Sequence, residues 1–542
     1  MAPYAKSPAT PEQLDAAVAQ LEAAGLDYPM DLATRRNPVE GATSTSLYLT
    51  MRDGVRVAVD VHVPPSGSPV PTCLRSTRYW RSTSGSPAKE HLEELEVERW
   101  LREGFALVLV DARGTGASFG TWDRCWDDAQ RDDLYEVVEW VVSQEWSDGS
   151  VGGYGTSYDG TTAHLLAATG HPAVRAVVPR FGLYDSYADT AAPGGVPLDW
   201  FLEHWSAINW ALDGHPDRGT VALPMPLQGS VLPVDDELLA KAQAEHVDNW
   251  DLWGDLRGDF TAADDLGNGT PSARIDALRR HKVPMWLWSS WYDGSYAQAQ
   301  LRQLADPELD VRVTIGPFSH GASQTTLGDP LQPAARNVPV ADQIRDIAAF
   351  LRDGSAAPAA LRYYRLGDGW QESDVWPPAD AVVVRHAIGP SAPWRVDVTA
   401  TSGAASTRWH GLIGGAPVVY AQPDDSTRLL LASFPAPQAI SGTPVVHLEL
   451  EAEATDLALH VYLEAVLPDG SVVYLTEGVH RTSGSGNLTF ELYPISVKLP
   501  TGSRVRVTLA GADTPLFRRI TEDDAVLAVL APSWIDLPEQ QS

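Results

Sequence analysis

The sequence has only two cysteines, few basic residues and no long apolar run. Cys73 and Cys125 are too few for a disulfide framework and lack metal-ligand spacing, so both are interpreted as ordinary buried or half-buried residues. Acidic residues number 71 against 40 basic ones, which gives a net charge of −31. This charge repels phosphate backbones and anionic membrane surfaces. The composition therefore disfavours nucleic-acid and membrane binding and favours high solubility.

Targeting and membrane-spanning signals are also missing from the sequence. Residues 1–7 contain no basic region followed by an apolar run. No uncharged apolar stretch approaches the roughly 18 residues that a membrane span needs. The sequence therefore predicts a cytoplasmic protein, and it leaves the oligomeric state open, a homodimer included.

The length and the first elements indicate several domains. A chain of 542 residues exceeds what one hydrophobic core usually organises, so two or three domains are expected. A helix is predicted first, because Thr10 is a suitable N-cap, Pro11 fits the first helical position and Gln13 completes a capping box. Its apolar stripe stops at Gly25. Residues 55–63 alternate in polarity after an Asp-Gly turn, which predicts a half-buried hairpin strand.

Short apolar runs then predict buried strands, and helical patterns separate most of them. The clearest helical pattern has apolar residues spaced by three and four within residues 134–141. Alternating strands and helices predict a mainly parallel sheet that is covered by helices on both faces. The apolar runs are residues 72–74, 106–110, 150–154, 174–178, 284–288 and 311–315.

Two segments break this alternation. The segment after residue 185 is rich in Trp, Asp and Pro and has helical pieces, which indicates an inserted cap. After residue 351 the pattern changes to strands, such as 446–451 and 504–509, which predicts a separate β-sandwich. The predicted domains are an N-terminal helical extension at 1–44, a catalytic α/β domain at 45–185 and 272–352, a helical cap at 186–271 and a C-terminal β-sandwich at 353–542.

A glycine-rich turn at residues 152–160 places one serine, Ser157, between a short apolar strand and a helix. A nucleophilic serine needs a tight strand-to-helix turn, small neighbours and a helix N-terminus directed at developing negative charge. Tyr158 comes next, so its backbone N–H is a predicted oxyanion donor. Asp159 stands where the usual Gly-x-Ser-x-Gly pattern has its second glycine, and Gly160 follows. A serine in such a turn is often only a turn residue.

A serine nucleophile needs a base, and the base needs an acid that orients it. Asp293 lies on a loop just after the predicted strand at 284–288, and His320 lies at the equivalent place after the strand at 311–315. Taken singly, such residues usually have packing or turn roles. The order Ser157, Asp293, His320, each after a strand, is the order expected of an α/β-hydrolase, and the cap falls where such folds accept insertions. The predicted fold is therefore an α/β-hydrolase with an inserted helical cap.

Together these motifs resemble the CocE/NonD hydrolases, the group of cocaine esterase, X-Pro dipeptidyl-peptidases, α-amino acid ester hydrolases and glutaryl-cephalosporin acylases. The resemblance covers residues 51–320 and implies a C-terminal jelly roll. It also implies that a tyrosine after the third strand joins the amide after the nucleophile in the oxyanion hole, and Tyr79 lies at that place. The matching segments are Met-Arg-Asp-Gly-Val at 51–55, Asp-Ala-Arg-Gly at 111–114, Gly-Thr-Ser-Tyr-Asp-Gly at 155–160, Trp-Tyr-Asp-Gly at 291–294 and Gly-Pro-Phe-Ser-His at 316–320.

The sequence gives less information about the substrate. The amino-acid ester hydrolases carry carboxylates two and three residues after the catalytic Asp, where this chain has Ser295 and Tyr296, so a free α-amino group has no obvious partner on that loop. Asp159 is another candidate partner, although a carboxylate in the first turn of a helix already has a structural role. The tryptophans of the cap predict an aromatic or bulky apolar acyl pocket, or alternatively a small core of the cap itself. The predicted substrate-contacting residues are Trp80, Asp159, Trp200, Trp205, Trp291 and Phe318.

The favoured interpretation is a serine hydrolase that cleaves small carboxylic esters, or amides, through an acyl-enzyme, with no metal or cofactor implied. Ser157 attacks, His320 moves the proton and Asp293 fixes the imidazole tautomer, while Tyr79 and the Tyr158 amide hold the oxyanion. One alternative on the same fold is an acyltransferase, an amino-acid ester hydrolase or an X-Pro dipeptidyl aminopeptidase. Another is a carbohydrate- or protein-binding module in which the β-sandwich is the working part.

Overall fold

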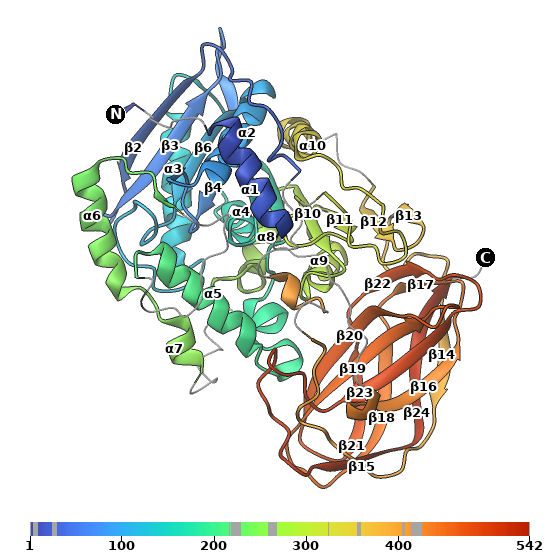
Figure 1. The fold of residues 1–542 in the computed structure, drawn as a ribbon. Coiled ribbons are helices and arrows are strands. Elements are labelled where there is room, and N and C mark those ends of the chain that lie inside the picture. The colour runs from blue at the N-terminus through green and yellow to red at the C-terminus, as the bar shows by residue number, and fades with distance from the viewer. Residues whose placement is uncertain are drawn as a thin grey trace.

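The computed structural model describes residues 2–3, 9–23, 30–215, 217, 229–257, 268–323, 325–354, 359–403, 407–412 and 425–540. Its largest sheet has the strand order β1-β2-β3-β6-β4-β7-β8-β10-β11-β12-β13 (Figure 1). Neighbours from β6 to β12 run parallel, and the pairs at both ends are antiparallel. The strands are β1 (Ala2–Pro3), β2 (Thr43–Thr50), β3 (Arg56–Val63), β4 (Val70–Thr77), β6 (Ala106–Asp111), β7 (Ser147–Thr156), β8 (Val174–Arg180), β10 (Met285–Ser290), β11 (Val311–Gly316), β12 (Leu361–Arg365) and β13 (Gly369–Ser373).

Every predicted apolar run lies in a strand of this sheet, except that Pro284 directly precedes β10, so the mainly parallel sheet is confirmed. Strands β6 and β10 are buried along their whole length, because helices cover both faces of the parallel part. The predicted hairpin strand is β3, which pairs with β2. The prediction that it is half-buried was wrong, since its six central residues are all buried and it lies inside the sheet, between β2 and β6.

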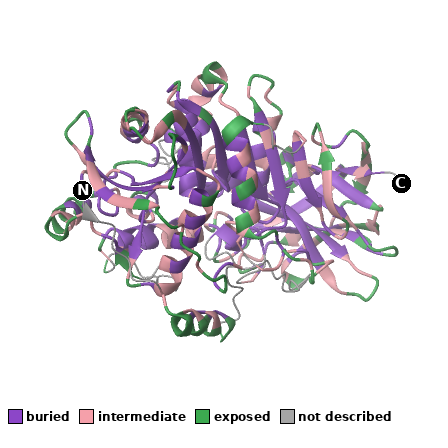
Figure 2. Cartoon of the chain, turned by 90° about the horizontal axis from the view of Figure 1, so that it is seen from above, coloured by how far each residue is buried: buried purple, intermediate pink, exposed green. Residues whose placement is uncertain are grey.

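Helices pack on the sheet, as the alternation of strands and helices predicted. Buried residues lie mainly along the strands, and exposed residues lie mainly in outlying helices and loops (Figure 2). The predicted helical pattern lies in α3, whose four apolar stripe residues are buried. In α1 the capping box is confirmed by reciprocal hydrogen bonds between Thr10 and Gln13 of 2.8 and 3.3 Å. The predicted stop at Gly25 lies outside the described residues. These helices are α1 (Pro11–Ala23), α2 (Pro87–Arg102), α3 (Asp128–Val142), α4 (Tyr158–Ala168), α8 (Ile275–His281), α9 (Tyr296–Leu304) and α10 (Val340–Asp353).

The segment between β8 and α8 is mostly helical where it is described, and we call it the cap. Part of its packing is internal, since Ala191, Leu202, Leu252 and Leu256 form a small core. Residues 216, 218–228 and 258–267 of the predicted cap lie outside the described residues. Its elements are η1 (Tyr187–Ala191), η2 (Pro193–Gly195), α5 (Asp199–Leu212), β9 (Ser230–Val231), α6 (Asp236–Glu245), η5 (His246–Asp248) and α7 (Leu252–Leu256), followed by η7 (Pro271–Arg274), and β9 pairs with β5 (Thr83–Ser84).

The C-terminal region is all-β, as predicted, and forms a second body beside the first sheet (Figure 1). The predicted strands at 446–451 and 504–509 are β18 and β23. Strands β12 and β13 come after residue 352, where the domain boundary was predicted, but they belong to the first sheet. The domain boundary and the jelly-roll topology stay predictions. One sheet contains β14 (Ala381–Ile388), β15 (Trp394–Arg395), β17 (Ala439–Gly442), β18 (Val445–Ala452), β21 (Gly486–Glu491), β22 (Ile495–Lys498) and β24 (Val526–Gln540), and the other contains β16 (Leu429–Pro435), β19 (Leu457–Val466), β20 (Val472–Thr482) and β23 (Arg504–Ala510); η8 (His410–Leu412) and η9 (Asp425–Thr427) lie outside the sheets.

Candidate active site

Ser157 sits at the turn between β7 and α4, in a backbone conformation that non-glycine residues rarely adopt. Its φ is +64° and its ψ is −124°, and its N–H donates a 2.9 Å hydrogen bond to the carbonyl of Arg180 at the end of β8. Residues are held in such strained conformations mostly at functional sites, where the surrounding structure enforces them. The turn therefore has the geometry of a nucleophile elbow.

Two glycines make this turn sterically feasible. A Cβ on Gly155 would lie 2.4 Å from the backbone of Asp159, and a Cβ on Gly160 would lie 2.3 Å from the carbonyl oxygen of Arg180. Neither contact can be relieved by moving a flexible side chain, because both meet backbone atoms. The close approach of α4 to β8 therefore explains why glycine stands at 160, one residue later than in the usual pattern.

Asp293 and His320 are in direct contact. Asp293 follows β10 and His320 follows β11, and these parallel neighbours bring both loops to the same edge of the sheet. Nδ1 of His320 lies 2.8 and 3.0 Å from the two carboxylate oxygens of Asp293. The Asp293 side chain is fully buried, whereas that of His320 is 15% exposed. Burial raises the pKa of Asp293, and the facing His320 and Arg408 oppose that effect.

The histidine loop also adjoins the serine turn. The carbonyl of Gly321, directly after His320, accepts a 2.9 Å hydrogen bond from Arg180, whose own carbonyl binds the Ser157 amide. The rings of Tyr296 and His320 lie 6.0 Å apart between centroids, and Tyr296 lines the same cavity as Ser157. The three predicted triad residues therefore lie around one site.

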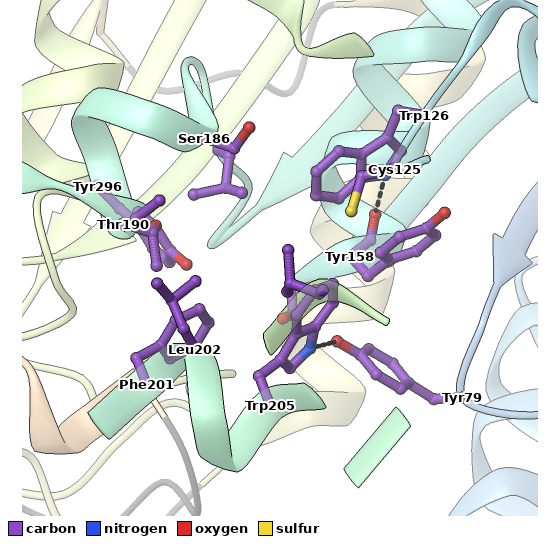
Figure 3. A pocket seen from close by; sticks show the side chains of 14 residues that line it. Tyr79, Cys125, Trp126, Tyr158, Ser186, Thr190, Phe201, Leu202, Trp205 and Tyr296 are labelled. Carbon is purple, nitrogen blue, oxygen red and sulfur yellow. Dashed lines mark hydrogen bonds between the residues drawn. The ribbon is translucent and has the colours of Figure 1, made fainter. Parts of the chain in front are cut away.

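Tyr79, on the loop after β4, points its hydroxyl at this site. The hydroxyl interacts with the side chain of Ser157 and accepts a 2.8 Å hydrogen bond from the indole N–H of Trp205 in α5 (Figure 3). Burial raises the pKa of Tyr79 to about 12, so the hydroxyl keeps its proton at neutral pH. Tyr79 is therefore available as a hydrogen-bond donor next to the serine.

Buried ion pairs hold the backbone on both sides of Tyr79. Arg78 lies 3.1 Å from Asp213 of the cap, and Arg81 lies 2.8 Å from Asp111 at the end of β6. The two arginines are fully buried, and such pairs are often better explained by the geometry they specify than by the stability they add. The loop that presents Tyr79 is thus fixed from both the sheet and the cap.

Tyr158 is immobilised by its neighbours. Its hydroxyl donates a 2.5 Å hydrogen bond to Gln130 and accepts one of 3.1 Å from Trp122, while its ring stacks on Trp126 at 4.6 Å. The indole of Trp126 donates to the Tyr158 carbonyl at 3.2 Å (Figure 3). As the first residue of α4, Tyr158 has an amide without an intrahelical acceptor, at the positive end of the helix dipole.

An apolar cavity of about 500 Å³, its open mouth included, lies over Ser157. Its lining contains no Asp, Glu, Lys or Arg among the described residues. The lining residues that the sequence did not single out come from the cap, from α9 and from the loop before α3. For most of them the one available signal was their aromatic or apolar character. The cavity is lined by Tyr79, Cys125, Trp126, Ser157, Tyr158, Leu183, Ser186, Thr190, Ala191, Phe201, Leu202, Trp205, Leu252 and Tyr296 (Figure 3).

Of the six predicted substrate-contacting residues, only Trp205 is among the described residues lining this cavity. Trp80 instead packs into a separate core, and its indole donates to the Leu212 carbonyl. Trp200 lies beside His204 and His410, and Trp291 is fully buried with its indole bound to the Tyr364 carbonyl. Phe318 is buried against other aromatic rings, including Trp288. These four rings have packing partners outside the cavity, so their role in substrate binding stays a prediction.

Asp159 is also not among the described residues that line the cavity. It is buried, lies 4.0 Å from Arg75 and interacts with the hydroxyl of Thr77. Arg75 in turn lies 2.8 Å from Glu96 of α2. Burial raises the pKa of Asp159 to about 7. This carboxylate is part of the packing between α4, β4 and α2, and its role as an ammonium partner stays a prediction.

Two acids of the cap, Asp185 and Asp189, are engaged by other groups of the protein. One oxygen of Asp189 accepts hydrogen bonds from the amides of Tyr184 and Asp185, and the other lies 3.6 Å from Arg302. Asp185 accepts hydrogen bonds from the amides of Tyr187 and Ala188. Neither carboxylate lines the cavity. Both cysteines are free and buried, as expected, and Cys125 lies in the cavity wall.

Comparison with known families and proteins shows the family to which the chain belongs. The family model for X-Pro dipeptidyl-peptidase (S15 family) matches residues 53–322, and that for the X-Pro dipeptidyl-peptidase C-terminal non-catalytic domain matches residues 354–528. A Mycobacterium bovis protein named as a serine esterase is 31% identical, over 88% of this chain and 91% of its own length. The chain belongs to the X-Pro dipeptidyl-peptidase S15 family, the CocE/NonD-like group of serine hydrolases. The predicted family, fold class and hydrolytic enzyme class are confirmed.

More distant relatives agree with this fold. The cocaine esterase of a Rhodococcus species is 24% identical, over 90% of this chain and 94% of its own. The crystal structure of an aminopeptidase from a marine sediment Thaumarchaeota archaeon covers 94% of this chain and 99% of that one, with a TM-score of 0.70 and 19% identity. In the described part of the chain, no helix is both long and apolar enough to cross a membrane.

Proposed function

We propose that the protein is a serine esterase in which Ser157, His320 and Asp293 form the catalytic triad. The observation that carries the proposal is the contact between His320 Nδ1 and buried Asp293, next to a serine at positive φ that opens into an apolar cavity. An ionised Asp293 makes Nδ1 the protonated nitrogen, which leaves Nε2 free to accept the Ser157 proton. The imidazole is then a general base in the correct tautomer.

The reaction follows from these positions. Ser157 Oγ attacks the ester carbonyl while His320 takes its proton, and the Tyr79 hydroxyl and the Tyr158 amide donate to the developing oxyanion. His320 then protonates the leaving alcohol, so the C–O bond breaks and an acyl-enzyme remains. A water molecule then attacks the acyl-enzyme while His320 takes its proton. The acyl–Oγ bond breaks, His320 returns the proton to Ser157, and the acid is released. Tyr79 stays neutral throughout, since its pKa is about 12.

The cavity supports esters whose group beside the reacting carbonyl is neutral and apolar or aromatic. Its described lining offers aromatic rings, aliphatic side chains and a few hydroxyls, but no charged side chain. A buried ammonium without a paired carboxylate costs several kcal/mol. Amino-acid esters and X-Pro peptides, which carry a free α-amine, are therefore disfavoured. Amide cleavage, acyl transfer, a cytoplasmic location and the predicted domain boundaries have no direct support from these contacts and stay predictions.

A fluorophosphonate reaction followed by peptide mapping tests the proposal. We expect modification of Ser157 in the wild-type protein and none in Ser157→Ala. The same substitution should remove the acyl-enzyme burst with a p-nitrophenyl ester and lower turnover by on the order of 10³-fold or more, with an unchanged circular dichroism spectrum. Folded wild-type protein that is not labelled at Ser157 would favour a binding module instead.

A further inference from the structure

The loop that carries Asp293 is in tight contact with a segment of the C-terminal region. This segment, residues 407–412, includes η8 and contacts the backbone of residues 292–294. A Cβ on Gly411 would lie 2.9 Å from the carbonyl oxygen of Tyr292, and one on Gly294 would lie 3.0 Å from Leu412. The contact therefore joins parts of the chain more than a hundred residues apart, with little room for adjustment.

Arg408 binds Gly294 through two hydrogen bonds. The Gly294 N–H donates to the Arg408 carbonyl at 3.0 Å, and Nη1 of Arg408 donates to the Gly294 carbonyl at 3.2 Å. Gly294 directly follows Asp293 and has a φ of +52°, in the left-handed region. Both polar backbone groups of this residue are thus held by one arginine from the other body of the protein.

The guanidinium is itself anchored in the C-terminal sheet. Nε of Arg408 donates to the Tyr474 hydroxyl at 3.1 Å and Nη2 donates to the Thr476 hydroxyl at 2.7 Å, both in β20. The ring of Tyr493 lies 4.6 Å from the guanidinium carbon. The side chain is fully buried. The planar fork thus connects a rigid strand to Gly294, a geometry that lysine cannot reproduce.

The charge of Arg408 also reaches the acid. The guanidinium acts to lower the pKa of Asp293, in the same direction as His320 and against the effect of burial. It therefore favours the ionised carboxylate that the imidazole needs. Displacement of a catalytic group by about 1 Å can lower turnover by roughly 10²-fold. Because Gly294 directly follows Asp293, an anchor for Gly294 fixes the position of the acid and so affects turnover.

We propose that Arg408 is a positioning residue for the catalytic acid, which holds Asp293 against His320 by clamping Gly294 to strand β20. The inference rests on the proposed function, because it assigns the triad acid to Asp293. It gives the C-terminal region, whose matched family model is described as non-catalytic, a part in shaping the active site without touching the substrate.

The test compares Arg408→Met with Arg428→Met in the full-length protein. Arg428 is a matched control: it is also buried, pairs with Glu464 at 3.3 Å and lies over the ring of Tyr462, in the same C-terminal region. Activity is measured per active site titrated with fluorophosphonate, so loss of folded protein does not count as loss of turnover. We expect kcat to fall by about 10- to 100-fold in Arg408→Met, with KM within about twofold, and to stay within about twofold in Arg428→Met.

A pH profile separates positioning from general stability. Loss of the Arg408 charge should move the acidic limb of kcat/KM to higher pH, whereas Arg428→Met should leave that limb in place. Arg408→Lys keeps a positive charge but loses the planar fork. The acidic limb of kcat/KM should therefore return to its wild-type pH, while kcat remains low. If Arg408→Met does not fold, the kcat values of Arg408→Lys and Arg428→Lys are compared instead.

Two outcomes overturn the proposal. Equal effects of the arginine substitutions on kcat per titrated site would show a purely structural role for Arg408, as would a normal kcat in Arg408→Met. Failure of the proposed function has a different signature, since wild-type protein would then not be labelled at Ser157 at all.

Discussion

The indole N–H of Trp205 donates a 2.8 Å hydrogen bond to the hydroxyl oxygen of Tyr79 (Figure 3). This contact joins the cap to the loop after β4. Because the tyrosine oxygen accepts from the indole, its own proton is left for another acceptor, and the Ser157 side chain is its neighbour. The cap thus orients a proposed oxyanion donor in addition to covering the cavity.

Tyr79→Phe removes one hydroxyl from a preorganised site. We expect kcat to fall by roughly 10²- to 10³-fold with a smaller change in KM, because the hydroxyl acts mainly on the charge that develops in the transition state. Steady-state kinetics with a p-nitrophenyl ester provide the measurement. A raised KM with an unchanged kcat would make Tyr79 a substrate-binding residue and place the donor elsewhere.

Trp205→Phe keeps an aromatic ring in the cavity wall and removes only the indole donor. A neutral hydrogen bond contributes about 0.5–1.5 kcal/mol, so kcat should fall by roughly 2- to 10-fold, less than in Tyr79→Phe. Trp200→Phe is the control, since Trp200 lies on the same helix and beside His410 rather than in the cavity. In the double variant Tyr79→Phe, Trp205→Phe, the second substitution should add little. Additive losses would show that the two residues act independently.

Blocking the α-amine of a substrate should carry no penalty. The described cavity wall has no carboxylate, so removing the ammonium leaves no buried charge unpaired. The measurement is kcat/KM at one pH for phenylglycine methyl ester, its N-acetyl form and phenylacetic acid methyl ester. We expect the two uncharged substrates to match or exceed the free amine. A preference of about a hundredfold for the amine would reassign the protein as an amino-acid ester hydrolase or aminopeptidase.

Asp159→Asn should become more stabilising as the pH rises. The pKa of Asp159 is about 7 in the folded protein and about 3.9 in an unfolded chain, so between these values the folded state binds more protons. Wild-type stability therefore falls from pH 4 to pH 7 through this group, and asparagine removes that loss. The Tm difference, variant minus wild type, should rise by a few degrees between pH 5 and pH 8, at roughly 2–4 °C per kcal/mol.

Asp148→Asn, at an exposed position of β7, should show no such trend in Tm. If Asp159 contributed mainly as an ionised partner of Arg75, the Asn variant would instead lose the most stability at pH 8.

The order of the site residues was predictable from the sequence, because it depends on local patterns. Short apolar runs marked the strands, and Ser157, Asp293 and His320 each follow one of them. Parallel strands place their carboxyl ends at one edge of a sheet, so this order along the chain was enough to predict that the residues converge. The capping box of Thr10 and Gln13 was equally predictable, since its partners lie three residues apart.

Contacts between distant segments were decided only by the tertiary structure. The sequence could not show that Trp80, Trp200, Trp291 and Phe318 pack outside the cavity, because an aromatic side chain fits a core and a substrate pocket equally well. Asp159 was ambiguous for a similar reason, until its burial beside Arg75 was seen. Arg408 carries no local signal, and its contact with Gly294 exists only because the C-terminal sheet docks on the acid loop. Sequence patterns thus determined which residues stand at the strand ends, and packing decided which side chains surround and support them.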